Sequence, residues 1–560
     1  MERLPLCQGL SKFTLIFPSP TISIACRTSR QWHVMDIRIG GYKYGALFPR
    51  LDLRFHDDSL QGEREYMMFK NILCIFSLAA MSAVLAGCSS AERSYTSDAK
   101  FSASIIGPLQ EKAIAYEGVY RNPVIIVHGF LGSNMLDKKT GKNVWGKFSS
   151  EDGYSISAEK MRALSIPMEK LKPLKDIKDE TVPNGALNTV EVNFLGMTFK
   201  ENAYINLVNV LHEGGYQLEG STLDPGKSYY NLFQFSYDWR RDLQENAVKL
   251  HQYILQKRKY IQKQYEALYG VKDYDVQFDL IGHSMGGLVS RYYLLYGTAD
   301  LPEEGDKPNI TWDGSKYIDR LIILGTPNAG YLDTLLEMQK GTDLPPFPPA
   351  LVGTWLTYYQ MMPDPSTCSV VYEHDHDKAV DIYDFLIWVK MKWGLANPDQ
   401  TEVFKVLLPD VKDPVERRLI AFDHLKKCLQ RAKRFKEAMN VPATPPDDVK
   451  LYLFLGNAVK TTRKATANEK TGELKVIEYG PGDGKVLESS ALYDKREGEK
   501  TWVPFFYGPI AWNSIIQLRA AHMGITNDPA FKDNILFVLS CVPTIRYKGV
   551  IEDYWKNKQE

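Results

Sequence analysis

The pattern of apolar and polar positions alternates between short apolar runs and helical spacing from residue 123 to residue 324. Continuous apolar runs at 123–127, 276–281 and 321–324 are typical of strands that are buried on both faces. Between them, apolar residues in 243–268 recur at helical spacing, with Lys and Arg on the other face, and 287–296 also predicts a helix. Strands that alternate with helices predict an α/β fold, with a mostly parallel sheet and helices on both faces.

Two long insertions, about 137–200 and 331–450, interrupt this alternation within a domain that we expect to span 116–560. Insertions in an α/β framework usually lie above the C-terminal edge of the sheet, where ligands bind. The second insertion is rich in Pro and aromatic residues. Five of its aromatic side chains are candidates for an acyl-binding lid or an interfacial surface, and burial in the core of a cap is the alternative: Trp355, Tyr358, Tyr359, Trp388 and Trp393.

A short basic and apolar segment at 67–87 has the features of a secretory signal. Lys70 precedes an apolar run over 72–86, and the small residues of "LAGC" end at Cys88. This ending resembles a bacterial lipobox, in which the cysteine is lipidated and becomes the mature N-terminus. The sequence thus predicts an exported lipoprotein of the cell envelope, tethered through 88–115 to its folded domain. Ser89 after the cysteine favours the outer membrane, and a buried core helix is the alternative for 67–87.

A signal at 67–87 leaves residues 1–66 without a role, because signal peptides begin at the N-terminus. These residues show no sustained apolar period and end just before Met67 and Met68. We therefore interpret 1–66 as translated upstream sequence and place the true start at one of the two methionines. Recovery of peptides from 1–60 in the native precursor would contradict this hypothesis.

Charge and cysteine content exclude several classes of protein. The 68 Lys and Arg balance the 68 Asp and Glu, so the basic excess of a nucleic-acid-binding protein is missing. A hydrophobic content of 44% is ample for a large core. The cysteines beyond Cys88 are Cys368, Cys428 and Cys541, which lack metal-ligand spacing. One disulfide between Cys368 and Cys428 is possible.

The motif GHSMG at 282–286 follows a predicted strand and opens a predicted helix. In an α/β-hydrolase this context makes the motif a tight elbow, which projects the serine hydroxyl above the sheet. Ser284 is therefore the predicted nucleophile, and a serine in an ordinary loop is the alternative. The backbone N–H of the residue after the nucleophile, Met285, is a predicted donor to the oxyanion. The second predicted donor is the amide of Phe130, in the loop after the strand at 123–127.

A serine nucleophile needs a general base and an acid that orients the base, and this fold places them in the order Ser, Asp or Glu, His. His522 is the predicted base, because it lies near the C-terminus just before an apolar helix; a capping histidine is the alternative. Asp483, in a turn between two extended runs, is the predicted acid, and Asp410 is a rival. His374 and His376 lie in "EHDHD", which we expect to be an exposed polar loop because its spacing forms no complete metal-ligand set.

Together these motifs resemble the lecithin:cholesterol acyltransferase-like α/β-hydrolases, a family that includes phospholipid:diacylglycerol acyltransferases and related bacterial lipases. The resemblance extends from about residue 122 to 539. It includes "PVIIVHGFLGSNMLD", "YDWRRDL" at 237–243, "GHSMGGLVSRYYL", "LGTPNAG", "GDGKV" and His522. By this resemblance, Ser284, Asp483 and His522 match the triad of the family, and Phe130 and Met285 match its oxyanion donors.

The resemblance implies serine-dependent acyl transfer on lipid esters through an acyl-serine, with water or a lipid hydroxyl as acceptor. Such a reaction needs no metal or organic cofactor, and its partners are a lipid ester and a membrane surface, with no nucleic acid. The chain departs from the family in its His-Gly loop, in Lys485, where Thr is usual, and in lacking a cysteine pair within 137–200. A short-chain carboxylesterase and a non-catalytic lipid- or partner-binding surface lipoprotein are the alternatives.

Overall fold

The computed structural model describes residues 13–16, 21–27, 32–39, 51–55, 114–149, 156–194, 197–202, 204–343, 345–496 and 508–540. The chain divides into two compact units, Met1–Phe101 and Ser102–Glu560. The predicted signal at 67–87, the predicted lipidation site Cys88 and nearly all of the tether lie outside the described residues. No helix within the described ranges is long and apolar enough to cross a membrane.

The first unit contains an antiparallel sheet of four strands in the order β1-β2-β3-β4. Its strands are β1 (Phe13–Ile16), β2 (Thr21–Arg27), β3 (Trp32–Ile39) and β4 (Leu51–Phe55). The sequence analysis predicts none of these strands, because residues 1–66 show no sustained period. The sheet does not test whether 1–66 is translated upstream sequence, which stays a prediction.

The second unit is built on a sheet of six parallel strands, in the order β12-β5-β13-β14-β17-β20. This arrangement confirms the predicted α/β fold. The predicted strands at 123–127, 276–281 and 321–324 correspond to β5, β13 and β14, within a few residues. The strands are β5 (Val124–Val127), β12 (Leu232–Phe235), β13 (Phe278–His283), β14 (Ile318–Leu324), β17 (Lys450–Gly456) and β20 (Ser514–Leu518).

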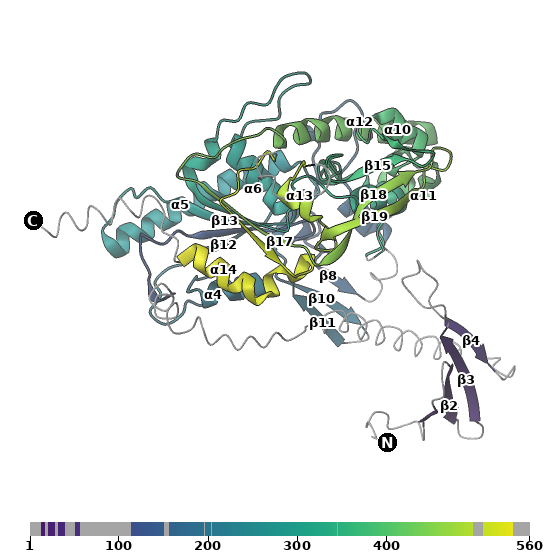
Figure 1. Cartoon of the computed structure of the whole chain (residues 1–560), viewed down its shortest axis with the longest axis horizontal. Helices are drawn as coiled ribbons and strands as arrows, with labels where there is room; N and C mark the ends of the chain where they lie inside the picture. Colours follow the sequence, from purple (N-terminus) through teal and green to yellow (C-terminus); the bar gives the residue numbers. More distant parts are fainter. Residues whose placement is uncertain are drawn as a thin grey trace, which may run out of the picture. The chain divides into compact units, whose positions relative to one another are not determined.

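Helices cover both faces of this sheet (Figure 1). Alternate side chains of a strand point to opposite faces, so Ile125 and Val127 join one core cluster and Val124 and Ile126 join the other. The first cluster includes α5 (Leu243–Tyr269) and α6 (Met285–Tyr296), which confirm the two predicted helices. The second includes α4 (Ile205–Glu213) and α14 (Pro529–Ser540). Both faces of every central strand are therefore buried, as the continuous apolar runs predict.

The two insertions have secondary structure of their own. The first contains β6 (Ser133–Asp137), β7 (Asn143–Trp145), β8 (Lys147–Ser149), α3 (Ala158–Leu164), η2 (Leu174–Asp176), β9 (Thr181–Ala186), β10 (Thr189–Phe194) and β11 (Met197–Asn202). The second contains α7 (Asp333–Lys340), α8 (Pro349–Val352), α9 (Leu356–Gln360), β15 (Ser369–Tyr372), β16 (Asp375–Ala379), α10 (Phe385–Met391), η4 (Gly394–Ala396), η5 (Pro398–Gln400), α11 (Thr401–Leu407) and α12 (Pro414–Met439).

The remaining elements surround the C-terminal part of the sheet. Strands β18 (Val459–Ala467) and β19 (Leu474–Gly482) form an antiparallel hairpin that joins β15 and β16 in a second sheet. Short helices η3 (Asp313–Tyr317), α13 (Glu488–Leu492) and η7 (His522–Asn527) lie in the connections. Strands β15 and β16 of the second insertion thus share a sheet with the hairpin that follows β17, and the insertions do not form a separate unit.

The five aromatic residues singled out in the second insertion are all buried. Trp355, Tyr359, Trp388 and Trp393 are 0% exposed and Tyr358 is 2% exposed. Burial in the core of the cap, the alternative in the sequence analysis, is therefore confirmed, and none of the five forms an interfacial surface.

The possible disulfide is wrong: Cys368 and Cys428 are both free and buried thiols. Cys368 lies just before β15, with its Sγ 4.0 Å from the carbonyl oxygen of Thr462, whereas Cys428 lies inside α12. Burial raises the pKa of both thiols, so neither is a reactive thiolate.

Candidate active site

Ser284 lies at the junction of β13 and α6, where the chain turns from strand to helix. Its backbone has φ 53° and ψ −125°, a conformation that costs a non-glycine residue free energy. Two hydrogen bonds hold it there: its N–H donates to the carbonyl of Leu324 at 2.8 Å, and the Thr326 hydroxyl donates to its carbonyl at 2.7 Å. The predicted elbow is therefore present, and the neighbouring strand β14 fixes its shape.

The glycines of the motif are required by close approaches of the backbone. A Cβ atom on Gly282 would lie 2.7 Å from the Cα of Gly287, inside the contact limit of two carbon atoms. A Cβ on Gly286 would lie 2.1 Å from the carbonyl oxygen of Val127, at the end of β5. Side chains at these positions would push α6 away from the sheet, and the serine would lose its place above the strand ends.

His522 and Asp483 complete a chain of hydrogen bonds that ends at the serine. The Nε2 of His522 lies 3.0 Å from the Oγ of Ser284, and its Nδ1 lies 2.8 Å from the Oδ2 of Asp483. The other carboxylate oxygen accepts the N–H groups of Lys485 at 2.9 Å and Val486 at 2.7 Å. Because Asp483 is an acceptor, Nδ1 carries the proton of a neutral imidazole, and Nε2 is left to accept the serine proton.

Segments far apart in the sequence bring these groups together. Asp483 directly follows β19, and its carbonyl accepts the N–H of His522 at 2.8 Å. His522 begins η7, a short connection after β20. Gly325, with φ 53°, makes room for the pair, because a Cβ there would lie 3.1 Å from Asp483 Oδ2. The rival acid Asp410 is exposed in the loop after α11, and no hydrogen bond or ion pair with His522 is found for it among the described residues.

The two predicted oxyanion donors lie beside Ser284. Met285 is the first residue of α6, where a backbone N–H has no acceptor within its own helix. Gly129, the neighbour of Phe130, is so close that a Cβ on it would lie 2.8 Å from the Cβ of Ser284. The peptide that carries the Phe130 amide is therefore next to a residue that borders the nucleophile.

Tyr237 and Trp239, in the motif "YDWRRDL", hold the loop that carries Phe130. The Tyr237 ring stacks on His128 with 4.2 Å between centroids, and its hydroxyl donates to the His128 carbonyl at 2.6 Å. The Trp239 ring meets the Phe130 ring edge to face at 4.9 Å. Burial lowers the pKa of His128 to about 4, so this histidine is a neutral packing residue. The motif at 237–240 thus contacts the site through the loop at 128–132, which we call the oxyanion loop.

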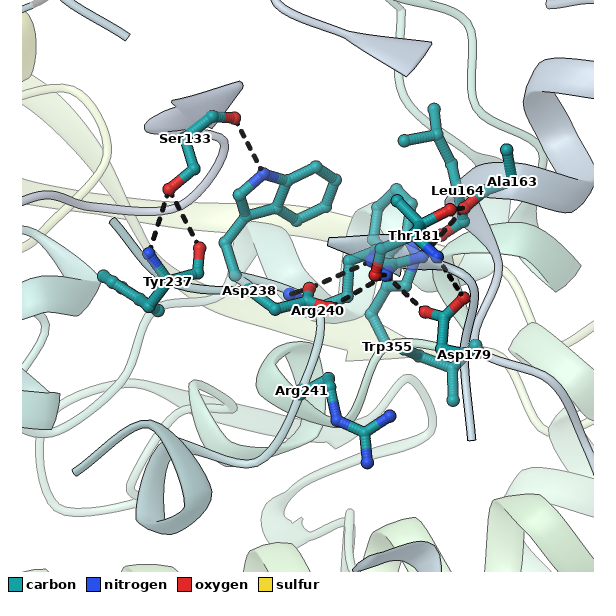
Figure 2. A network of polar contacts seen from close by, with 12 residues as sticks. Ser133, Ala163, Leu164, Asp179, Thr181, Tyr237, Asp238, Arg240, Arg241 and Trp355 are labelled. Carbon is teal, nitrogen blue, oxygen red and sulfur yellow. Dashed lines mark hydrogen bonds and ion pairs between the residues drawn. The ribbon is translucent and has the colours of Figure 1, made fainter. Parts of the chain in front are cut away.

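Arg240 of the same motif joins the first insertion to the end of β12 (Figure 2). Its guanidinium is fully buried between Asp238, at 2.8 and 3.0 Å, and Asp179. It also donates to three backbone carbonyls of the insertion, those of Ala163, Ser165 and Thr181. Burial opposes ionisation of Asp238, but the ion pair with Arg240 prevails and lowers the pKa of this carboxyl. The network closes on itself and offers no group to a substrate.

The histidines of "EHDHD" lie apart from this site. His374 precedes and His376 lies within β16, an exposed strand, and the Nδ1 of His374 is 3.0 Å from Glu469. The segment is exposed, as expected, but it is a strand and not a loop. Across the described ranges, no group of three or more His, Cys, Asp or Glu side chains is arranged to hold a metal ion.

Three comparisons with known proteins bear on this site. Residues 192–346, which include Ser284, match the family "Lecithin:cholesterol acyltransferase". The chain is also 25% identical, over 268 residues, to the "Lysosomal phospholipase A and acyltransferase" of Bos taurus, an alignment of 46% of this chain and 52% of that protein. The chain therefore spans about half the length of this curated relative.

Solved structures with a similar course of the chain are more distant. The Tle4–Tli4 complex gives a TM-score of 0.39 at 12% identity, covering 75% of this chain and 99% of the other. Mature lipase BlEst2 of Bacillus licheniformis gives a TM-score of 0.26 at 12% identity, covering 76% and 94%. These scores are too low to support a functional inference. The sequence matches support a likeness of this chain to the lecithin:cholesterol acyltransferase-like α/β-hydrolases, over residues 192–346 for the family and over 268 residues for the bovine relative.

Proposed function

We propose that this chain is a serine-dependent enzyme that transfers acyl groups from lipid esters to water or to a lipid hydroxyl. The observation that carries the proposal is the hydrogen-bonded chain from Asp483 through His522 to Ser284, with distances of 2.8 and 3.0 Å, at a strained strand-to-helix elbow. A scaffold that served only for binding would have no need to hold these three side chains in line.

In the first half of the reaction, the Oγ of Ser284 attacks the ester carbonyl carbon while the Nε2 of His522 takes its proton. A new Oγ–C bond forms, and an electron pair of the carbonyl moves to its oxygen. The N–H groups of Phe130 and Met285 donate to this oxyanion. When the tetrahedral intermediate collapses, the ester C–O bond breaks, and His522 returns the proton to the leaving alcohol.

In the second half, water or a lipid hydroxyl gives a proton to His522 and attacks the acyl carbon. The bond between that carbon and Ser284 then breaks, and His522 returns the proton to the serine. Asp483 stays ionised throughout and stabilises the imidazolium that forms twice in each cycle. Because both carboxylate oxygens of Asp483 have fixed partners, the imidazole enters each step in the same orientation.

The proposed donor is a lipid ester, and two findings support it. The matched family is named for lecithin, and the bovine relative is named a phospholipase and acyltransferase. The matched region of this chain contains the elbow but neither Asp483 nor His522, so the acid and the base are supported by geometry and not by the family match.

Product analysis tests the proposal. The full chain in detergent is incubated with acyl-labelled phospholipid and a long-chain alcohol, beside Ser284→Ala and a control, Ser290→Ala. Ser290 is buried on α6 and donates to the Gly286 carbonyl. We expect labelled free acid or labelled ester from the wild type and the control but not from Ser284→Ala. Turnover that survives in Ser284→Ala would refute the proposal, and activity confined to acetyl and butyryl esters would favour a short-chain carboxylesterase.

We also propose that the chain is exported and lipidated at Cys88, so that the enzyme works at the surface of the cell envelope. The support is the order of basic, apolar and small residues from Lys70 to Cys88. Cells are labelled with a radioactive fatty acid and fractionated. We expect the label on the wild type in the outer membrane and no label on Cys88→Ser. Equal labelling of both proteins would contradict the proposal.

A further inference from the structure

The hydroxyl of Tyr204 connects two segments that border Ser284. It lies 2.6 Å from the backbone nitrogen of Gly129, in the oxyanion loop, and 2.9 Å from the Nδ1 of His283, the residue before the nucleophile. The Nε2 of His283 in turn lies 3.4 Å from the carbonyl oxygen of His522. A single phenol thus links the oxyanion loop to the elbow, and His283 continues the link toward the loop of the proposed base.

The donor and the acceptor of each hydrogen bond in this series follow from the protons that each group carries. The Gly129 N–H can only donate, so it donates to the Tyr204 oxygen. The phenolic proton is then left for the Nδ1 of His283, which accepts it. His283 is neutral, because burial lowers its pKa to about 3, and its remaining proton is on Nε2, facing the His522 carbonyl. Burial raises the pKa of Tyr204, which keeps the phenol protonated.

Tyr204 is itself held by the main sheet. It is 5% exposed and caps the start of α4, where its N–H donates to the Asn188 carbonyl at 3.0 Å. The side chain of Asn188 exchanges two hydrogen bonds with that of Gln234 on β12, at 2.6 and 3.1 Å. The phenol oxygen therefore has a fixed position relative to the strands, which makes it suited to locate the glycine loop.

We propose that Tyr204 is a positioning residue that sets the height of the oxyanion loop above Ser284. The inference rests on the proposed function and deepens it. Gly129 lies so close to the nucleophile that a Cβ on it would be 2.8 Å from the Cβ of Ser284 and 3.2 Å from the Tyr204 hydroxyl. Any movement of Gly129 moves the attached Phe130 amide relative to the site of the oxyanion.

Removal of this hydroxyl therefore acts on the transition state. Loss of one oxyanion donor typically lowers kcat by about 10²–10³. Because Tyr204 acts on such a donor indirectly, we expect Tyr204→Phe to lower kcat by about 10- to 100-fold and to leave KM within about twofold. A residue with a role in stability alone would change the amount of folded enzyme and not the kcat of each active site.

The control is Tyr296→Phe, a buried tyrosine on α6 whose hydroxyl donates to the Ala438 carbonyl, at 2.8 Å. Both variants are compared with the wild type for thermal unfolding, for kcat and KM on a phospholipid, and for inhibition by an alkyl boronic acid, which forms a tetrahedral adduct with a serine. The proposal predicts similar Tm losses in both variants. It also predicts that boronate affinity and kcat fall in parallel in Tyr204→Phe alone. A kcat within twofold of the control would overturn it.

A second measurement does not depend on activity. In the full-length Ser284→Ala protein, ¹⁵N-labelled histidine reports which ring nitrogen of His283 carries the proton, with His283→Asn to assign the signal. We expect the proton on Nε2, and a changed signal when Tyr204→Phe is added. A proton on Nδ1 would overturn the role of Tyr204 whether or not the chain is an acyl-transfer enzyme. Failure of the proposed function would instead appear as wild-type turnover in Ser284→Ala.

Discussion

The molecule contains two buried chains of polar side chains that look alike and differ in what they can do. One runs from Asp483 through His522 to Ser284, and the other links Asp179 and Asp238 through Arg240 (Figure 2). Each has a carboxylate that is almost fully buried and a nitrogen base that bridges it to a second group. The two differ in their last member. We call the series that ends at the Ser284 hydroxyl the open chain, and the series centred on Arg240 the closed chain.

The Arg240 network ends in groups that are already satisfied, because the guanidinium divides its donors between two carboxylates and backbone carbonyls. An arginine also keeps its proton at any ordinary pH. The His522 chain ends in the Ser284 hydroxyl, beside the N–H groups of Phe130 and Met285, for which no acceptor is found among the described residues. An imidazole can both accept and donate a proton, which a guanidinium cannot. A buried polar chain therefore performs chemistry only when its base can exchange a proton and its end is open.

The largest expected effect comes from a substitution of the acid in the open chain. In Asp483→Asn, the amide oxygen can still accept the N–H groups of Lys485 and Val486, but the imidazole is held in the wrong tautomer. We expect kcat to fall by about 10⁴ with little change in Tm. Steady-state kinetics and thermal unfolding of the same preparation check this. A fall of less than tenfold would mean that Asp483 is not the orienting acid.

A substitution in the closed chain should lower the free energy of unfolding and have little effect on activity. In Arg240→Met, two carboxylates lose their cation in a buried site, and we expect about 3–5 kcal/mol of lost stability. The control is Arg241→Met, since the neighbouring guanidinium is partly exposed and donates to Glu245 and to the carbonyl of Ile177. Denaturant unfolding measures the cost. Activity per folded molecule should fall less than tenfold, and a stability loss equal to that of the control would contradict the structural role.

The buried histidines near the two chains allow a pH comparison. Burial lowers the pKa of His283, next to Ser284, to about 3, and that of His424, which borders the same small cavity as Arg240, to about 4. A histidine with a lowered folded-state pKa binds protons more weakly when folded. Its contribution to stability is therefore complete above the unfolded pKa of about 6.5 and decreases as the pH falls toward 4.

Between pH 7 and pH 5, each such histidine should remove about 2 kcal/mol of stability. Replacing His424 by Gln, which can keep the hydrogen bond to the Thr354 carbonyl, should reduce this pH dependence by that amount and leave activity at pH 7 within about twofold. Urea unfolding at the two pH values provides the measurement. If the wild type and His424→Gln lose equal stability on acidification, His424 titrates normally in the folded protein.

The open chain could be predicted from the sequence, whereas the closed one could not. The elbow has a local signature, because the two glycines stand close to the serine in the sequence, although the backbone contact that requires Gly282 is with Gly287 and the one that requires Gly286 is with Val127 at the end of β5. Asp483 and His522 lie where the order of an α/β-hydrolase places them. Arg240, by contrast, finds Asp179 across 61 positions, inside an insertion whose course no pattern in the sequence defines. The fully buried aromatic residues of the cap were ambiguous for the same reason.

Tyr204 shows the same limit close to the active site. It has no motif around it, and its role depends on the phenol oxygen reaching Gly129 and His283, which are 75 and 79 positions away. Periodicity reports which face of an element is buried, and it does not report which polar atoms meet there. Strands β5, β13 and β14 and helices α5 and α6 were therefore predictable, whereas β12, β17 and β20 were not predicted and the contacts that tune the site required coordinates.

The smallest expected effect concerns Lys485, where the chain departs from the family that it resembles. Its Nζ lies 3.1 Å from Asp333 and 3.5 Å from Glu337, next to the open chain, but the side chain is 49% exposed. Solvent screens such pairs, so Lys485→Thr should cost less than about 1 kcal/mol. Burial raises the pKa of Glu337, and without the lysine this carboxyl should take up a proton more readily. Kinetics and urea unfolding from pH 5 to 8 would test this. A fall in kcat of more than tenfold at every pH would contradict this expectation. It would show that the lysine side chain affects Asp483, whose carboxylate accepts the backbone N–H of Lys485, and that the ion pairs belong to the open chain.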